Sequence, residues 1–281
     1  MAVAGGIMQK KEEGQHDLGW ASVLPPPEQK ATHVRAMFGR IARRYDLMNR
    51  LMTLGRDRAW RRYTAQQLDL EQESKIPAPH VTGGQSPSPE GDLRKSRIVL
   101  DLATGTGDMA LEVVRQHPDS RVVGADFSPE MLALAREKAG TAAPRLTWVV
   151  ADAMRLPFAN ASFDSVVTGF ALRNVTDIPT AFGEMARVMR TGGRIASLEI
   201  AKPRTPLFRR LFGFYFYQVV PLIGSLISGQ RAAYTYLPHS LTGFLTPDEI
   251  ASVMRQTGWD QVRHRELTLG TVTVHTGVRG S

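Results

Sequence analysis

The sequence predicts an α/β protein built on a doubly wound, mainly parallel sheet of seven strands, with a helical lid contributed by its N-terminal part. Three observations support this fold class. From residue 98 onwards, short apolar strands alternate with amphipathic helices, which is the pattern of right-handed βαβ units. The first of these strands leads into a turn with two glycines that opens a helix. The last part of the sequence contains two strands with the pattern of an antiparallel hairpin.

The order of the segments before the sheet follows from their composition. Residues 1–30 are expected to be a flexible leader, because they lack apolar periodicity and end near three prolines. Apolar residues then recur at three- and four-residue spacing, so residues 34–70 are expected to form the helical lid. Residues 71–97 are rich in Pro, Gly and Ser, which favours a disordered insertion. Apart from this insertion, residues 31–281 are expected to form one domain.

Strands and helices account for most of the remaining chain. The expected strands share an apolar run bounded by turn residues, and they cover residues 97–104, 121–127, 146–153, 163–172 and 192–201. The expected helices have one apolar face, and they cover residues 106–117, 129–140, 176–190 and 246–258. An apolar, aromatic stretch at residues 205–245 precedes the last helix, and residues 262–279 supply the final two strands.

Composition limits both the chemistry and the location. The chain of 281 residues contains no cysteine, which excludes disulfides, thiolate catalysis and cysteine-ligated metal sites. Its seven histidines lie apart without the spacing of a metal site, so no metal is expected. The net charge of +8 favours contact with an anionic surface. There is no secretory signal and no uninterrupted apolar run of spanning length, so we expect a cytoplasmic protein that meets the inner face of the cell membrane only peripherally.

The segment from Val99 to Asp108, VLDLATGTGD, joins a strand to a helix through the glycine turn. Gly105 and Gly107 have no Cβ, so the backbone can turn tightly and approach a ligand closely. The helix that follows presents free N–H groups, which can bind a carboxylate or a phosphate. Asp101, at the end of the strand, can accept a hydrogen bond from a ligand's ammonium group. The glycine pair alone is a weak signal, because many strand–helix turns carry one.

Acidic residues also end the next two strands. Asp126 follows the glycines by about 20 residues, the distance at which a carboxylate binds the hydroxyls of a ribose. Asp152, with Ala153 beside it, ends the third strand, where it would face the edge of an adenine. The three carboxylates are expected to converge, because strand ends meet at the ligand crevice of an α/β sheet. Since Asp101 would repel a pyrophosphate but attract an ammonium, S-adenosyl-L-methionine is favoured over a dinucleotide as the cofactor.

Four stretches carry a family resemblance: residues 37–62, the glycine turn, residues 155–177 and residues 190–203. Together they resemble the ubiquinone/menaquinone biosynthesis C-methyltransferase family, which has the Rossmann-like fold of class I methyltransferases. The resemblance covers residues 34–65 and 98 to about 278, and the strings YDLMN and LRNVTD are specific to the family. It implies C-methylation of a polyprenylated quinol in respiratory quinone biosynthesis, with demethylmenaquinol and the ubiquinol precursor as alternatives. The leader and the insertion depart from the family pattern.

The resemblance also assigns positions around the cofactor. The family's cofactor contacts correspond to Thr106, Asp126, Asp152 and Ala153 of this sequence. Gly169 stands where a serine is common in the family, so a side-chain contact is missing there and only the backbone can line the pocket.

The reaction itself sets what else the chain must supply. A quinol carbon beside a hydroxyl becomes nucleophilic when that hydroxyl loses its proton, and it then attacks the methyl group in line with the departing sulfur. Arg173 and Asn174 follow the fourth strand, so they are expected to hold the phenolate oxygen. Tyr45, Asp46 and Asn49 lie in the segment that resembles the family's lid, and Asp46 is the candidate base if it is buried. Structural roles remain alternatives for all five: an ion pair, core packing, a helix cap or a surface charge.

The aromatic residues between Phe208 and Tyr217 fall at helical spacing beside two arginines. Core packing is one interpretation; the resemblance favours an apolar mouth for an isoprenoid tail, with the arginines on anionic headgroups. The expected partners are therefore a lipid-tailed quinol and a membrane surface, and a homodimer is left open. Methylation of another small or lipidic phenol, or of RNA, remains an alternative, as does a non-catalytic binding module. No aromatic-bearing RNA module or clustered arginine face is apparent, so no nucleic acid is expected.

Overall fold

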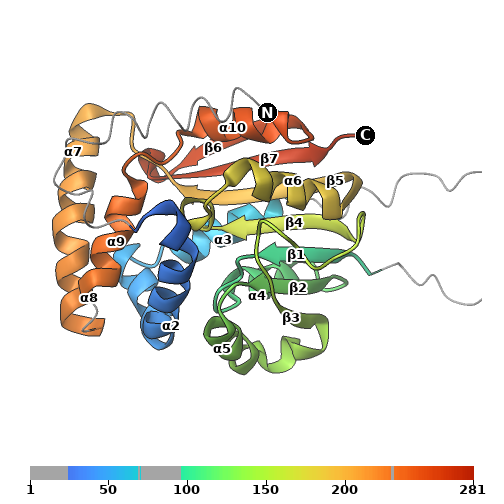
Figure 1. The fold of residues 1–281 in the computed structure, drawn as a ribbon, viewed down its shortest axis with the longest axis horizontal. Coiled ribbons are helices and arrows are strands. Elements are labelled where there is room, and N and C mark those ends of the chain that lie inside the picture. The colour runs from blue at the N-terminus through green and yellow to red at the C-terminus, as the bar shows by residue number, and fades with distance from the viewer. Residues whose placement is uncertain (1–24, 69, 71–95, 229–230) are drawn as a thin grey trace, which may run out of the picture.

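The computed structural model describes residues 25–68, 70, 96–228 and 231–281. A seven-stranded sheet runs through these residues in the order β3-β2-β1-β4-β5-β7-β6 (Figure 1). The strands are β1 (Ile98–Leu102), β2 (Arg121–Asp126), β3 (Leu146–Val150), β4 (Phe163–Gly169), β5 (Met189–Ile200), β6 (Trp259–Leu267) and β7 (Val272–Arg279). The first five strands pair in parallel, whereas β7 pairs antiparallel with both β5 and β6. The expected doubly wound, mainly parallel sheet is confirmed.

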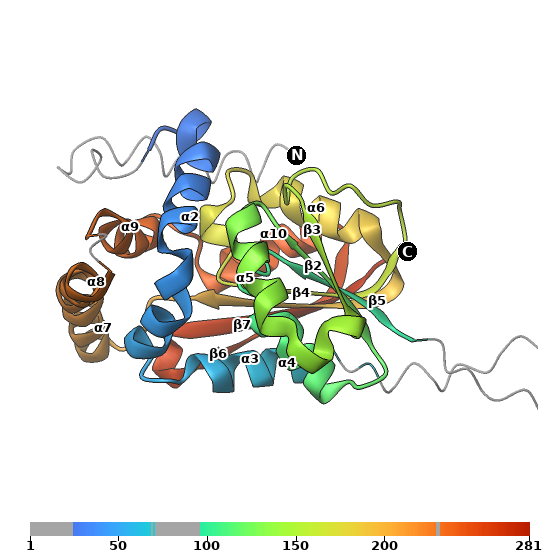
Figure 2. The ribbon, with the colours of Figure 1, turned by 90° about the horizontal axis from the view of Figure 1, so that it is seen from below.

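Helices cover both faces of this sheet. The α-helices of the described residues are α2 (Pro27–Met52), α3 (Asp57–Gln66), α4 (Asp108–Gln116), α5 (Pro129–Ala139), α6 (Ile178–Val188), α7 (Pro206–Phe214), α8 (Val220–Ser228), α9 (Arg231–Leu241) and α10 (Pro247–Gln256). One face packs against α3 and α4, and the other face packs against α6 and α10 (Figure 2). Short connecting helices are η2 (Gly140–Arg145), η3 (Leu172–Asn174), η4 (Tyr215–Val219) and η5 (Thr268–Gly270).

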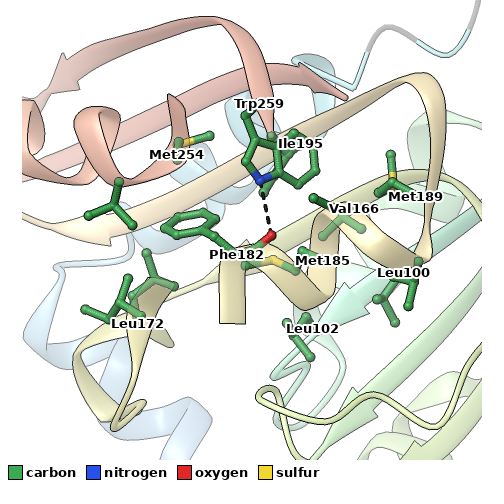
Figure 3. Packing of buried hydrophobic residues seen from close by; sticks show 14 of the residues in the cluster. Leu100, Leu102, Val166, Leu172, Phe182, Met185, Met189, Ile195, Met254 and Trp259 are labelled. Carbon is green, nitrogen blue, oxygen red and sulfur yellow. Dashed lines mark hydrogen bonds between the residues drawn. The ribbon is translucent and has the colours of Figure 1, made fainter. Parts of the chain in front are cut away.

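Apolar side chains from alternate strand positions fill the two layers. On the α6 and α10 side, Trp259 lies against Met254 and Ile195, and its indole N–H donates to the carbonyl oxygen of Phe182 at 3.2 Å (Figure 3). That hydrogen bond satisfies the one polar group of a side chain that is otherwise fully buried. Burial of each large side chain of this kind stabilises the fold by about 1.5–3 kcal/mol.

The lid is the long helix α2, which lies between the sheet and the pair α8 and α9 (Figure 1). It begins at Pro27, earlier than expected, because proline fits the first turn of a helix, where its missing N–H would have no partner. Its buried face includes Val34, Met37, Ile41 and Met48, which pack against apolar residues of α9. The expected leader up to residue 24 and the expected insertion from residue 71 to 95 lie outside the described residues.

The apolar stretch after β5 forms α7, the π-turn η4 and α8, followed by α9. At Gly224 a Cβ would come within 2.2 Å of the Tyr234 ring, so α8 approaches α9 more closely than any side chain would permit. The run Pro206–Ile227 is also long and apolar enough to cross a membrane by length and composition, with a mean hydropathy of 1.3. Arg209 and Arg210 interrupt this run, so it is not an uninterrupted apolar stretch of spanning length.

Candidate active site

A cavity opens at the carboxyl ends of β1, β2 and β4 and is covered by α2; we call it the carboxylate cavity. It contains about 890 Å³ of empty space, its open mouth included. The lid lines it with apolar side chains that include Val34, Phe38 and Tyr45. Because β1 lies between β2 and β4, the cavity is at the point where the strand order reverses, which is where α/β sheets bind ligands.

The glycine turn forms one wall of this cavity. Gly105 and Gly107 have φ angles of 56° and 82°, in the left-handed region that favours glycine. A Cβ on Gly107 would lie 2.7 Å from a ring carbon of Trp148, so that position accepts no side chain. Gly107 also caps α4 without a side-chain hydrogen bond, and the N-terminus of a helix favours an anion.

Asp126 fastens the turn to the end of β2. Its carboxylate accepts the backbone N–H of Gly105 at 2.7 Å and that of Ser128 at 2.9 Å. Burial raises the pKa of Asp126, and those N–H groups oppose the rise. Asp126 also lines the carboxylate cavity, as do Asp152 and Ala153 at the end of β3. The carboxyl groups at the second and third strand ends therefore converge as expected.

Asp101, at the end of β1, is fully buried and does not line the cavity. Burial raises the pKa of Asp101 to about 7, against the hydrogen bond from Thr104 and the nearby N–H of Ala110. One carboxyl oxygen, Oδ2, accepts the Thr104 hydroxyl at 2.5 Å, while Oδ1 has no hydrogen-bond partner. An unpartnered buried oxygen is costly unless a ligand satisfies it, so this carboxyl fits a ligand that brings an ammonium group.

A second cavity lies on the other side of the lid's C-terminal half, between α2, η4, the end of β5 and η5; we call it the apolar cavity. It contains about 1140 Å³ of empty space, and apolar side chains such as Trp60, Phe212 and Phe216 make up most of its lining. Tyr45 and Phe170 line both cavities. The two cavities therefore adjoin at these two aromatic rings.

Arg173 is the buried guanidinium that lines the apolar cavity, which Arg56 and Asp57 also line. Its side chain is 5% exposed, and its guanidinium pairs with Glu199 of β5 at 3.4 Å. Glu199 also accepts the backbone N–H of Leu172 at 2.6 Å. Burial raises the pKa of Glu199, although the charge of Arg173 opposes the rise. Arg173 Nε, a donor, and Asn174 Oδ1, an acceptor, are buried without hydrogen-bond partners, so they suit a ligand with hydroxyl groups, which donate and accept.

The predicted site residues divide into three groups by position. Those that line the carboxylate cavity are Tyr45, Gly105, Asp126, Asp152, Ala153, Gly169 and Asn174. Those that line the apolar cavity are Tyr45, Asn49 and Arg173. Those that line neither cavity are Asp46, Asp101, Thr106 and Gly107. Asp46 instead accepts hydrogen bonds from Thr106 and Lys138, each at 2.5 Å.

Sequence reasoning missed Glu199, Lys138 and the aromatic pair Trp60 and Phe170. Glu199 had a visible signal, because it is the one acidic residue in the apolar strand 192–201. Lys138 is one of several charges on an amphipathic helix and carries no such signal. Phe170 adopts a φ of 60°, which is rare for an aromatic residue and aims its ring between the cavities.

Curated relatives resemble the chain over most of its length. Demethylmenaquinone methyltransferase of Roseiflexus castenholzii is 44% identical over 92% of this chain and 98% of its own. The enzyme of that name from Deinococcus radiodurans is 42% identical over 89% of this chain and 94% of its own. Ubiquinone/menaquinone biosynthesis C-methyltransferase UbiE of Geobacter sulfurreducens is 41% identical over 90% of each chain.

Solved structures share the fold at low sequence identity. A SAM-dependent methyltransferase from Thermotoga maritima has a TM-score of 0.53 at 15% identity, over 87% of this chain and 98% of its own. A chain of the complex between the Haloferax volcanii Trm112 methyltransferase activator and a methyltransferase has the same TM-score at 18% identity, over 82% and 94%. The family model described as the ubiE/COQ5 methyltransferase family matches residues 27–279. The resemblance inferred from the motifs is therefore confirmed, and the chain belongs to the ubiE/COQ5 methyltransferase family.

Proposed function

We propose that this protein transfers a methyl group from S-adenosyl-L-methionine to a ring carbon of a polyprenylated quinol in respiratory quinone biosynthesis. The observation that supports this most directly is the meeting of two unlike cavities at Tyr45 and Phe170. One cavity offers carboxylates and free N–H groups to a polar, positively charged cofactor. The other offers apolar walls and one buried guanidinium to a lipid-tailed phenol. The relatives named as demethylmenaquinone methyltransferases favour a naphthoquinol, with the benzoquinol precursor as the second candidate.

When bound, S-adenosyl-L-methionine supplies an electrophilic methyl group on a sulfonium. Residues in and behind the wall of the carboxylate cavity are our candidates for its polar groups. Asp101 has an unpartnered oxygen for the amino acid's ammonium, and the N-terminus of α4 suits its carboxylate. Asp126 and Asp152 line the cavity, and we assign Asp126 to the ribose hydroxyls and Asp152 to the edge of the adenine.

On the acceptor side, Arg173 stabilises the phenolate that makes the ring carbon nucleophilic. A guanidinium is already protonated and has no acceptor site for the ring proton, so in this proposal the ring proton passes to a solvent water molecule. Glu199 holds the guanidinium in place and balances its charge through the ion pair between the two side chains. The amide of Asn174 is the second polar group available to the quinol ring.

The isoprenoid tail fits the apolar cavity and leaves it beside α7. Phe212 and Phe216 line that cavity from one side of the helical run, while five apolar residues project from its other side. These exposed residues, which we call the α7–α8 stripe, are Leu207, Leu211, Phe214, Leu222 and Leu226. They are between 59% and 78% exposed, which is unusual for large apolar side chains at helical spacing.

We assign the α7–α8 stripe to the surface of a membrane with anionic lipids. Arg209 and Arg210 are exposed on the same helix, where they can contact headgroup phosphates. The helices of the run also pack against the protein: Val220 is fully buried, and Gly224 lies against the ring of Tyr234. Such contacts on one side favour a helix that lies on a membrane surface over one that crosses it.

The test of the function is a transfer assay with labelled S-adenosyl-L-methionine and three acceptors: reduced demethylmenaquinol, the demethylated ubiquinol precursor and bulk RNA. We expect label in a quinol and none in RNA. The Arg173→Gln variant should lower kcat by about 10²–10³-fold, the loss typical of removing an electrostatic stabiliser of a developing oxyanion. The KM for S-adenosyl-L-methionine should stay unchanged in that variant.

Arg190→Gln is the matched control, because Arg190 pairs with Asp164 and lines neither cavity. The assignment fails if cofactor binds but neither quinol is labelled. Label in another lipidic phenol would instead identify a methyltransferase of different acceptor specificity, and label in RNA would support the alternative class.

A further inference from the structure

A cluster of charged and hydroxyl groups joins the lid to the glycine turn outside both cavities. Lys138, near the end of α5, places its ammonium nitrogen 2.5 Å from Asp46 Oδ2 and 2.6 Å from Asp108 Oδ1. The same nitrogen is 3.0 Å from the hydroxyl oxygen of Thr106, which itself donates to Asp46 Oδ1 at 2.5 Å. Three side chains, from α2, the glycine turn and α4, therefore meet around the ammonium group of Lys138.

The cluster continues into the helix that follows the lid. Asp108 also lies 3.4 Å from Arg61 of α3, and Arg61 pairs with Asp57 of the same helix. Burial favours protonation of Asp108, but the charges of Arg61 and Lys138 hold its pKa below the ordinary range. The carboxylate of Asp108 is therefore charged at neutral pH and attracts both cations. Asp46, Lys138 and Asp108 are each about one-third exposed, so solvent reaches the cluster without separating it.

The position of the cluster relates the two cavities to each other. Asp46 lines neither cavity, but its neighbour Tyr45 lines both. Thr106 lies between Gly105 and Gly107, the residues that shape the cofactor wall. A bond from Asp46 to Thr106 and Lys138 therefore fixes the distance between the ring of Tyr45 and the glycine turn.

We propose that Asp46 and Lys138 are positioning residues that hold the lid closed over the glycine turn and so keep Tyr45 between cofactor and acceptor. The proposal rests on the proposed function for the identity of the acceptor, but the contacts of Asp46 and Lys138 are independent of that function. It gives Asp46 a role other than that of proton acceptor. Both oxygens of its carboxylate already accept hydrogen bonds, and neither faces a cavity.

Two single variants and their combination test this role. Asp46→Asn and Lys138→Met each remove one charge with little change in size. Each should weaken the binding of S-adenosyl-L-methionine, measured by calorimetry without any acceptor, by about tenfold, within the usual range of coupling between sites. The double variant should be no weaker than either single variant, because groups in one network are not additive. Lys138→Arg should retain most of the affinity.

Hydrogen exchange of the lid gives a second readout that does not depend on activity. Amide exchange in α2 should be faster in both single variants than in the parent protein. Addition of cofactor should slow this exchange less in the variants than in the parent protein. Arg136→Met is the matched control, since Arg136 is an exposed residue of the same helix, two positions away. It should leave affinity and exchange unchanged.

A pH profile separates the positioning role from the base role. If Asp46 positions the lid, Asp46→Asn lowers kcat/KM at every pH and leaves the shape of the profile unchanged, and Lys138→Met does the same. The proposal is overturned if Asp46→Asn abolishes turnover with unchanged cofactor affinity, or if Lys138→Met resembles the parent protein. If the protein does not methylate a quinol, the calorimetry and the exchange data can still be interpreted. The proposed function and the positioning role can therefore fail separately.

Discussion

If Asp101 contacts the cofactor as proposed, its buried carboxyl should make cofactor binding sensitive to pH. Its pKa is raised to about 7 by burial, well above the value of about 3.9 in an unfolded chain. Protonated Asp101 is therefore tolerated in the free protein, and its contribution to stability is full below about pH 4 and lost as pH rises through about 7. An ammonium brought by the cofactor favours the ionised form. Binding should consequently release a proton near neutral pH.

We expect the affinity for S-adenosyl-L-methionine to rise about tenfold between pH 6 and pH 8, as the ionised fraction of Asp101 rises through its pKa. Calorimetry in two buffers of different ionisation enthalpy would measure both the affinity and the released proton. Asp101→Asn should flatten the pH dependence and should also reduce the loss of unfolding free energy on going from acid to neutral pH, to which the raised pKa values of Asp126 and Glu199 also contribute. A pH-independent affinity in the parent protein would contradict this role for Asp101.

Gly169 is the site residue at which a substitution should raise both the stability of the fold and the affinity for the cofactor. A Cβ there would lie 3.4 Å from the terminal methyl of Met109 and 4.0 Å from Leu198, and its φ is outside the left-handed region. Gly169→Ser should therefore raise the free energy of unfolding by about 0.5 kcal/mol, because glycine in a strand loses more backbone entropy on folding. One hydrogen bond added in the carboxylate cavity should tighten cofactor binding by about 0.5–1.5 kcal/mol.

Gly107→Ser is the contrasting variant for the same measurements. Its Cβ would meet Trp148 at 2.7 Å and its φ is 82°, so it should lose both stability and cofactor binding. Denaturant unfolding and cofactor titration of the two variants give the comparison. Equal losses in both would mean that Gly169 requires glycine for a reason other than space.

At the scale of elements, the α7–α8 stripe should direct the protein to membranes. Leu211→Gln and Phe214→Gln each remove apolar area whose burial is worth about 1.5–3 kcal/mol. The double variant should bind vesicles containing phosphatidylglycerol at least about tenfold more weakly in a sedimentation assay. Arg209→Gln should weaken binding only to the anionic vesicles, by about 1 kcal/mol.

Val150→Gln is the control for that experiment, because Val150 is also an exposed apolar residue but lies on the edge strand β3. It should bind vesicles as the parent protein does. An exposed apolar face can also bind a second copy of the chain. Analytical ultracentrifugation of the α7–α8 stripe variants tests this alternative. A loss of dimer with unchanged vesicle binding would reassign the stripe to self-association.

The elements were predictable where one residue pattern repeats within one segment. Strand and helix positions after residue 98 follow from apolar periodicity, and the strand-end carboxylates follow from those positions. The limits of elements were less predictable. The fourth strand was expected to reach residue 172 but ends at Gly169, because Phe170 turns the chain with a φ of 60°. Likewise, α2 begins at Pro27, since the proline that ends a loop also starts a helix.

At the scale of the whole molecule, the unpredicted part of the site consists of contacts between distant segments. Glu199 of β5 meets Arg173 of η3, which follows the neighbouring strand β4, and Lys138 meets Asp46 across 92 positions of sequence. No local pattern encodes such pairs, because they depend on how the lid is placed over the sheet. The pairing of two cavities at Tyr45 and Phe170 depends on the same placement. The residues that could take part in binding or catalysis were therefore predictable, but the side chains with which they pair were not.

The position of β7 within the sheet also affects how the protein is made. It is the last of the seven strands to be synthesised, yet it lies between β5 and β6. On the ribosome, β5 therefore remains an open, apolar edge while α7 to α10 emerge, and open edges invite pairing with other chains. Completion of the sheet waits for the final strand, which makes the nascent chain dependent on protection until translation of that strand is finished.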